Sequence, residues 1–249
     1  MVSLGLPILL AAFVSVSPCL ESAPDLSSLS QGLERYVDGQ GDVNYRRIAA
    51  ERSPLFSKFL DDAVSVCPQT YASFSVEERI SLLINLYNAW VIEFMTGNDG
   101  TPTSILKVRI KGKSVFDAPL IKVRWHPTLL TLNQLEKSLL PALRVDPRYH
   151  FALVCGAKSC PKLRRKPYLA ENLNKTLREE TLKFLRDPER NQLTGSVWRV
   201  SRLFDWYKSE FGNSETATID WVMNQLGPEA KRPERLEFLE YDWAPNQRK

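Results

Sequence analysis

The segment from Ser75 to Met95, SVEERISLLINLYNAWVIEFM, constrains the fold more than any other part of the chain. Ser75 and Glu78 have the spacing of a capping box, in which a serine and a glutamate three residues later satisfy each other's backbone N–H groups. After Glu78, apolar residues dominate up to Met95, so a helix here would be apolar around most of its circumference. Such a helix is buried, and we therefore predict that the rest of the chain packs around residues 75–96.

The chain has the composition to enclose this helix, with 43% hydrophobic and 25% charged residues among 249. No linker or fixed-period repeat divides it. We predict an α+β fold, helix-rich with a small mixed or antiparallel sheet. The all-apolar run 150–155 (HFALVC) is predicted as a core strand. The run 107–113 (KVRIKGK) alternates strictly, which, if extended, puts Lys107, Arg109, Lys111 and Lys113 on one basic face. Asn133 with Glu136 is the expected start of a further helix.

The amino terminus is predicted to be a signal peptide over residues 1–23, followed by a single domain over residues 24–249. Its apolar stretch, Leu4 to Val14, is too short to cross a bilayer and gives way to small and polar residues. The alternatives are an apolar helix that packs on the domain and a lipid anchor at Cys19, which Pro18 disfavours. We therefore expect a secreted or periplasmic protein without an integral membrane span.

Cleavage near Ala23 would remove Cys19 and leave three cysteines, of which at least one is unpaired within the chain. Cys155 ends the apolar run 150–155 and precedes Gly156, whose turn could direct backbone N–H groups at an oxyanion. These features permit a papain-like or transglutaminase-like thiol hydrolase or transferase. The base would be His150 or His126, oriented by Asn85, Asn88 or Asp242, and Lys158 would add a cation.

Other interpretations of these residues stay open. Cys155 can be a packing residue, because cysteine is often buried, or it can form a disulfide with Cys160. A metal site of His150, Cys155 and Cys160 lacks the usual zinc spacing, so we expect no metal and no cofactor. In a regular strand His150 and Cys155 would point to opposite faces.

Two further groups have a structural and a functional interpretation. Asn85 and Asn88 lie three apart on one helix face, where they can clamp the backbone of a neighbouring loop or line a cleft with Cys155. Four aromatic residues have core spacing rather than that of a sugar-stacking platform, namely Trp206, Tyr207, Tyr241 and Trp243.

The run 162–166 (KLRRK) forms a second basic patch, and with Lys158 and Arg164 it is a candidate binding site for an anionic ligand or peptide. A solvated surface is the simpler interpretation. No nucleic-acid-binding motif is present, so no nucleic acid is expected as a partner.

An ordered set of motifs resembles the domain of unknown function 547 family. The motifs are YVDGQGDVNYRRI, INLYNA (84–89), DPRYHFALVCGAKSCPKLR (146–164), DPERNQL (187–193), VSRLFDWYKSEFG (200–212) and YDWAPN (241–246). The resemblance covers about residues 36–246 and implies a fold more firmly than an activity, because the role of the family is not settled.

The resemblance adds Glu136 to the candidate site and raises one conflict. Members commonly have a Glu-His pair in a helix start like LDDIEH, whereas this chain has LNQLEK, with Glu136 followed by Lys137. A tryptophan often found before INLYNA is Leu83 here. We therefore expect an exported protein with a thiol hydrolase or transferase site at Cys155. The alternative is a non-catalytic secreted binding or scaffold module with a degenerate site, which Lys137 favours.

Overall fold

The structure is a computed structural model, and it describes residues 19–97, 103–144 and 146–248. At its centre lies the 21-residue helix α5 (Val76–Thr96). Ser75 Oγ accepts the backbone N–H of Glu78 at 3.2 Å, and the Glu78 carboxylate accepts that of Ser75 at 2.7 Å. Most of the helix from Ile80 to Met95 is buried. The prediction of a capped, buried helix over residues 75–96 is confirmed.

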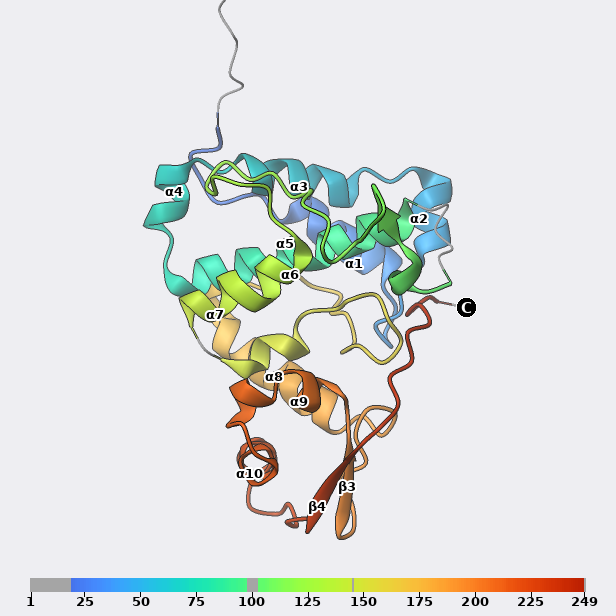
Figure 1. Ribbon diagram of the computed structural model, residues 1–249. Helices are drawn as coiled ribbons and strands as arrows, with labels where there is room; N and C mark the ends of the chain where they lie inside the picture. The colour runs from blue at the N-terminus through green and yellow to red at the C-terminus, as the bar shows by residue number, and fades with distance from the viewer. Residues whose placement is uncertain (1–18, 98–102, 145, 249) are drawn as a thin grey trace, which may run out of the picture.

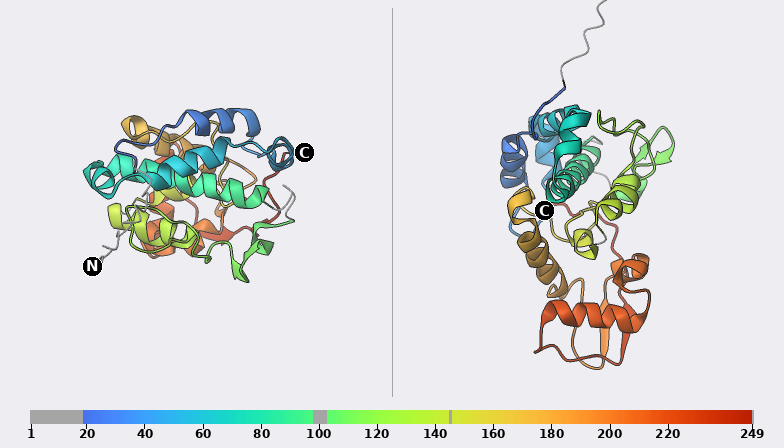
Figure 2. Two further views of the ribbon diagram at one scale, coloured as in Figure 1. Left: turned by 90° about the horizontal axis from the view of Figure 1, so that it is seen from above. Right: turned by 90° about the vertical axis from the view of Figure 1, so that its left-hand side faces the viewer.

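Other helices enclose α5 from several directions. α1 (Ser27–Tyr36) lies on one side of α5 and α7 (Leu140–Leu143) on the other, while α3 (Leu55–Ser65) crosses above it (Figures 1 and 2). The shorter helices of this end are α2 (Tyr45–Glu51), α4 (Pro68–Ser73), η1 (Ile105–Lys107), α6 (Leu132–Gln134) and the π-helix η2 (Leu135–Leu139). The apolar faces of these elements form one large core around α5.

The opposite end of the molecule is built from α8 and most of the chain that follows it (Figure 1). Its elements are α8 (Leu173–Leu185), β3 (Val197–Val200), α9 (Leu203–Trp206), η5 (Lys208–Phe211), α10 (Glu215–Leu226) and β4 (Arg235–Phe238). The short helix η4 (Ala170–Asn172), just before α8, contacts α5. A second core cluster holds this end together, with Phe151, Phe184, Trp198, Phe204 and Phe211 as its large buried rings. Phe151 belongs to η3 (Pro147–Phe151), which therefore joins the two ends.

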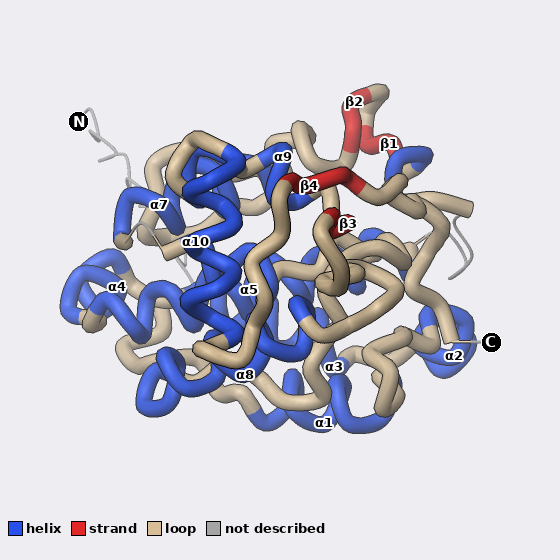
Figure 3. Tube along the Cα trace, turned by 90° about the horizontal axis from the view of Figure 1, so that it is seen from below, coloured by secondary structure: helices blue, strands red, loops and turns tan. Residues whose placement is uncertain are grey.

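Strands are a minor part of the described chain. β1 (Arg109–Ile110) pairs antiparallel with β2 (Lys113–Ser114), and β3 pairs parallel with β4. The two sheets are separate, and helix far exceeds strand in the trace (Figure 3). The protein is thus a helix-rich single body with two small two-stranded sheets, where the sequence predicted one.

The predicted core strand over residues 150–155 is wrong. The 3₁₀ helix η3 occupies residues 147–151, with Pro147 at its first position and the Asp146 side chain accepting the N–H of Arg148 at 3.2 Å. Beyond it, Asn88 of α5 accepts the N–H of Val154 at 2.8 Å. A side chain therefore supplies the hydrogen bond that a neighbouring strand would give, and an apolar run remains buried without a sheet.

The predicted extended face over residues 107–113 is also wrong. Lys111 and Gly112 both have positive φ, 49° and 79°, as a tight hairpin turn between β1 and β2 requires. The following helix begins at Thr131 instead of Asn133, because Thr131 and Gln134 form the capping box there.

A disulfide joins Cys19 to Cys67 close to the first described residue. The backbone N–H of Leu20 also donates to Ser65 O at 2.8 Å, so this segment is part of the fold. Most of the predicted signal peptide, residues 1–18, lies outside the described residues. Cleavage near Ala23 would remove Cys19, so the Cys19–Cys67 disulfide can form only in a chain that retains Cys19. The unpaired thiol expected from that cleavage is absent, since all four cysteines are bonded in pairs.

The described ranges contain no helix that combines the length and apolar character needed to cross a bilayer. Two disulfides are typical of a protein from an oxidising compartment.

Candidate functional site

The loop 155–160 carries the second disulfide, between Cys155 and Cys160. The loop turns at Gly156, which has φ +85°, and a Cβ there would lie 3.2 Å from Met95 Cγ and 3.3 Å from Val91 Cγ1. A side chain at position 156 would therefore be strained by its own backbone and pressed against α5. The glycine allows the loop to lie directly on the central helix.

Backbone hydrogen bonds join this loop to the C-terminal segment of the chain. Lys158 N–H donates to Ala244 O at 2.7 Å, and Asn246 N–H donates to Gly156 O at 3.0 Å. On another side, Arg190 Nη2 donates to Lys158 O at 2.7 Å and Arg190 Nε to Cys160 O at 2.6 Å. The loop closed by the disulfide is thus held by two parts of the chain that are distant in sequence.

The two sulfur atoms have different surroundings. Cys155 is half-buried, whereas Cys160 is only 2% exposed. Cys160 Sγ accepts the Cys155 N–H at 3.1 Å and the Tyr241 O–H at 3.1 Å. Tyr241 Oη lies farther from Cys155 Sγ, at 3.5 Å. Hydrogen-bond donors therefore converge on the buried sulfur.

The disulfide lines a cavity of about 440 Å³. One part of its wall is aromatic and comes from α9 and the C-terminal segment, where Trp206, Tyr241 and Trp243 have ring centroids 4.6–5.6 Å apart. Trp206 is 45% exposed, so its ring is open to a ligand. These rings were predicted to be core, and the structure instead places them around a hollow.

Another part of the wall is polar and charged. Glu136 and Lys137 line it from η2, and His150 lines it from η3. Lys137 is exposed, while Glu136 and His150 are buried. Cys155, His150 and Glu136, three residues of the candidate site expected from the sequence, thus line one cavity.

His150 lies between two carboxylates. Its Nε2 is 3.1 Å from Glu210 Oε1 and its Nδ1 is 3.6 Å from Glu136 Oε1. Neither pair of atoms has the geometry of a hydrogen bond. The Tyr207 ring stacks on the imidazole at a centroid distance of 3.7 Å. Tyr207 and Tyr87 donate their hydroxyl protons to Glu136, and Tyr149 donates to Glu210.

The charges of this cluster shift several pKa values. Burial opposes protonation of His150, but Glu136 and Glu210 outweigh it and raise the pKa of His150 above its ordinary value. Burial acts against ionised Glu210, yet His150 and Tyr149 lower the pKa of that carboxyl. Burial and the charge of Glu136 raise the pKa of Tyr207. The cluster favours a protonated imidazole with each nitrogen facing a carboxylate, an arrangement poorly suited to removing a proton from a thiol.

Asn85 and Asn88 both clamp neighbouring backbone and lie outside the lining of the disulfide cavity. Asn85 donates to Tyr168 O at 2.8 Å and accepts from Tyr168 N at 2.9 Å. Asn88 donates to Ala152 O at 2.9 Å and accepts from Val154 N. Their amide groups are committed to the main chain, as the structural interpretation predicted.

The remaining candidates are spread around the site. Asp242 and Lys158 are exposed, pair with each other at 3.8 Å and do not line the disulfide cavity. Arg164 pairs with Glu180 at 3.1 Å in a different cavity. His126 lies in a turn, with Nδ1 3.1 Å from Thr128 O.

The sequence analysis missed Glu210 and Arg190. Glu210 follows Tyr207 at a three-residue interval typical of one helix face, which was a usable signal. Arg190 lies in the motif DPERNQL, but its contacts with Lys158 and Cys160 come from a loop 30 or more residues earlier. In the described residues, no cluster of His, Cys, Asp and Glu is arranged to hold a metal ion.

Comparison with known proteins agrees with the motifs. No curated protein and no solved structure is significantly similar to the chain. Residues 71–185 match the family model described as "Protein of unknown function, DUF547". This span includes the motifs at 84–89 and 146–164, and it is shorter than the range 36–246 suggested by the motifs alone. The chain therefore carries a domain of the DUF547 family over residues 71–185.

Proposed function

We propose that the cavity is a site of thiol–disulfide exchange, in which Cys155 is the sulfur that is attacked and Cys160 the sulfur that leaves. The observation that carries this proposal is the asymmetry of the disulfide. Cys155 is the more exposed of the two cysteines that line the cavity, while Cys160 is buried and its sulfur accepts hydrogen bonds from Tyr241 and the Cys155 N–H.

The asymmetry supports a direction of attack. Exchange is faster when the leaving sulfur is a stabilised thiolate, and hydrogen bonds to the charged form provide that stabilisation. The donors point at Cys160, so its thiolate is the favoured leaving group. An external thiol would also reach Cys155 more easily, because both cysteines line the cavity but Cys155 is half-buried and Cys160 is only 2% exposed.

The reaction needs a substrate that carries two thiols, such as a reduced cysteine pair in a peptide. One substrate thiolate attacks Cys155 Sγ, the Cys155–Cys160 bond breaks, and Cys160 leaves as a thiolate. The second substrate thiolate attacks its partner sulfur in the mixed disulfide and releases Cys155 as a thiolate. The substrate is oxidised to a disulfide by two electrons, and the protein is reduced to the dithiol.

Export to an oxidising compartment is part of this proposal. The pairs Cys19–Cys67 and Cys155–Cys160 support it, since disulfides persist in the periplasm and outside the cell. A signal peptide that ends before Cys19 would be compatible with both bonds.

The experiment is equilibration of the protein in glutathione buffers of decreasing potential, followed by acid quenching, alkylation and peptide mass spectrometry. Cys19–Cys67 is the internal control, because it closes a separation of 48 residues and does not line this cavity. We expect Cys155–Cys160 to open first, while Cys19–Cys67 stays closed. The Cys160→Ser variant should form a stable glutathione adduct at Cys155, and Cys155→Ser should form much less at Cys160.

Two results would overturn the exchange site. One is that Cys155–Cys160 needs conditions as reducing as Cys19–Cys67 does. The other is preferential modification of Cys160. Turnover is then measured directly, by oxidation of a dithiol peptide by the wild-type protein and by the Cys155→Ser variant.

The thiol hydrolase or transferase predicted from the sequence is the second candidate, and it applies to the reduced protein. A bonded sulfur cannot attack a carbonyl, so the disulfide must first open. The observation in its favour is that the exposed Lys137 lines the same cavity as Cys155, where its cation could stabilise a thiolate. Fast alkylation of Cys155 in the reduced protein, lost in Lys137→Gln, would support this candidate. If Cys155 is alkylated slowly and the Cys155–Cys160 disulfide does not exchange, the non-catalytic binding module is the remaining candidate function.

A further inference from the structure

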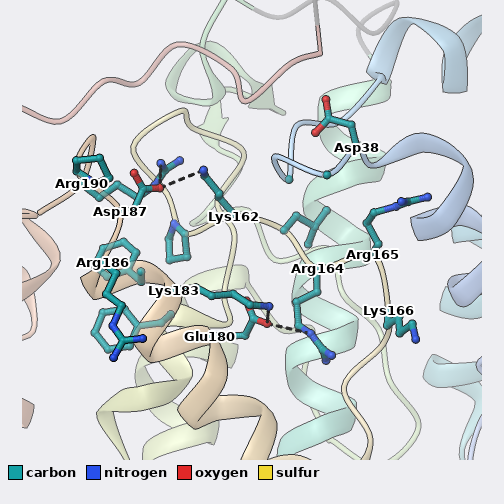
Figure 4. A pocket seen from close by; sticks show the side chains of 17 residues that line it. Asp38, Lys162, Arg164, Arg165, Lys166, Glu180, Lys183, Arg186, Asp187 and Arg190 are labelled. Carbon is teal, nitrogen blue, oxygen red and sulfur yellow. Dashed lines mark hydrogen bonds and ion pairs between the residues drawn. The ribbon is translucent and has the colours of Figure 1, made fainter. Parts of the chain in front are cut away.

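A second cavity, of about 590 Å³, adjoins the first at Pro161, which lines both. Its walls come from the loop at Asp38, the basic run 162–166, the end of α8 and the segment that follows α8 (Figure 4). Seven Lys or Arg residues and three Asp or Glu residues line it. The lining therefore has a formal charge of +4, since seven minus three is four.

Two of the three carboxylates are each shared between two cations (Figure 4). Asp187 Oδ2 lies 2.6 Å from Arg190 Nη1 and 3.3 Å from Lys162 Nζ. The two carboxylates, Asp187 and Glu180, are both buried. They therefore fix the cations and are not themselves open to a ligand. Arg190 also pairs with the exposed Glu189 at 3.6 Å, so this first group, of Asp187 and its two cations, is neutral when that carboxylate is counted.

The second of these groups lies on α8. Glu180 Oε1 is 2.8 Å from Lys183 Nζ and 3.1 Å from Arg164 Nε. Lys183 has a side chain that is 67% exposed, so its ammonium group can still face a ligand. The Arg164 guanidinium also lies over the Tyr168 ring, with its Cζ 5.2 Å from the ring centroid. These contacts orient the cations without neutralising them.

Three further cations of this cavity have no ion pair with any described residue. Arg165 uses one nitrogen on the Glu34 carbonyl, at 2.9 Å. Lys166 and Arg186 are exposed and stand at opposite sides of the hollow in Figure 4. A singly charged carboxylate would balance one of them, whereas a group with two or more negative charges can balance several.

We propose that this second cavity binds a phosphate-bearing anion. A phosphate monoester has between one and two negative charges at neutral pH and three acceptor oxygens, which suits several fixed Lys and Arg donors. The same chemistry is presented by a free phosphate compound and by a phosphomonoester lipid headgroup. The proposal does not depend on the exchange reaction at Cys155.

The test measures binding of inorganic pyrophosphate to the full chain by titration calorimetry. Flotation with phosphatidylcholine vesicles, with and without phosphatidic acid, distinguishes a lipid source from a free one. The variant is Lys166→Glu/Arg186→Glu, which changes two exposed cations without an ion pair in the described part of the chain and should leave the fold intact. Its pyrophosphate affinity should fall by about tenfold or more, as expected for lost charge-assisted hydrogen bonds.

The matched control is Lys107→Glu/Lys113→Glu, which makes the same change of net charge at exposed positions in η1 and β2. It should retain the wild-type affinity. Binding lost equally in both variants would mean a general charge effect and would overturn the proposal. So would wild-type protein that binds neither pyrophosphate nor the phosphatidic acid vesicles. Binding of vesicles but not pyrophosphate would assign the site to a lipid headgroup.

Discussion

Tyr241 Oη lies 3.1 Å from Cys160 Sγ and donates a hydrogen bond to it, across 81 residues of sequence. Burial and the charge of Glu136 raise the pKa of Tyr241. The phenol therefore stays protonated in neutral solution and remains a donor when Cys160 becomes a thiolate. This contact relates the C-terminal segment to the chemistry of the disulfide.

Replacing Tyr241 with phenylalanine should slow the opening of Cys155–Cys160. One hydrogen bond to the leaving sulfur is lost, and its net contribution of about 1 kcal/mol corresponds to about a fivefold lower rate. The measurement is the rate of disulfide opening at a fixed concentration of reduced glutathione. Tyr36→Phe is the control, because Tyr36 donates to Glu51 at 2.6 Å and does not line the cavity. An unchanged rate in Tyr241→Phe would show that its hydroxyl does not stabilise the leaving sulfur.

Replacing Arg190 with glutamine should destabilise the fold strongly. Arg190 and Asp187 are 7% and 8% exposed, and the substitution leaves a buried carboxylate without its nearest cation. Breaking such a pair costs about 3–5 kcal/mol. The free energy of unfolding in urea measures this loss. Arg199→Gln removes an exposed pair with Glu237 and should cost about 1 kcal/mol or less. Equal effects of the two variants would contradict the role of Arg190 in holding the loop 155–160.

Replacing Asn88 with alanine should cost about 3 kcal/mol. The change leaves the N–H of Val154 and the C=O of Ala152 buried without their partners. Asn224→Ala on α10 is the control, because Asn224 is exposed and alanine favours a helix, so little or no stability should be lost. The comparison is again made by urea unfolding. A loss below about 1 kcal/mol in Asn88→Ala would mean that water replaces the amide.

Asn88 also shows why one part of the fold could be predicted from the sequence and another could not. The helix α5 is encoded locally, by Ser75, Glu78 and a long apolar run. The segment 150–155 is equally apolar, but the partner of Val154 lies 66 residues earlier in the chain. The burial of the segment 150–155 could therefore be predicted. Whether this segment forms a strand or a coil depended on the position of Asn88, which the local sequence does not reveal.

The candidate site divides in the same way. Cys155 and His150 lie close together in sequence and could be found from their residue types and neighbours. Glu210 reaches His150 only because η5 folds back onto η3. The pairing of Cys155 with Cys160 was one of several open alternatives, because neighbouring cysteines alone do not determine the oxidation state.

The cluster around His150 should make stability depend on pH on both sides of an optimum. The folded pKa of His150 is raised, so the stabilisation from its protonation is fully present below the unfolded value of 6.5 and is lost as pH rises through the folded value. The folded pKa of Glu210 is lowered, so its contribution is present above the unfolded value of 4.5 and is lost as pH falls through the folded value. Both contributions are therefore present between pH 4.5 and 6.5.

The variant His150→Gln checks this through unfolding free energies measured across the pH range. Its deficit relative to wild type should be largest between the two unfolded values and should shrink as pH rises above the folded pKa of His150, because the wild-type imidazole then loses its charge. His126→Gln is the matched control, since that ring lies in a turn and, within the described residues, its hydrogen bonds join it to Thr128 alone. A deficit in His150→Gln that is the same at every pH would mean that the ring stays neutral between its two carboxylates. In that case His150 would be free to act as the base of a thiol reaction, and the hydrolase would become the stronger candidate for the reduced protein.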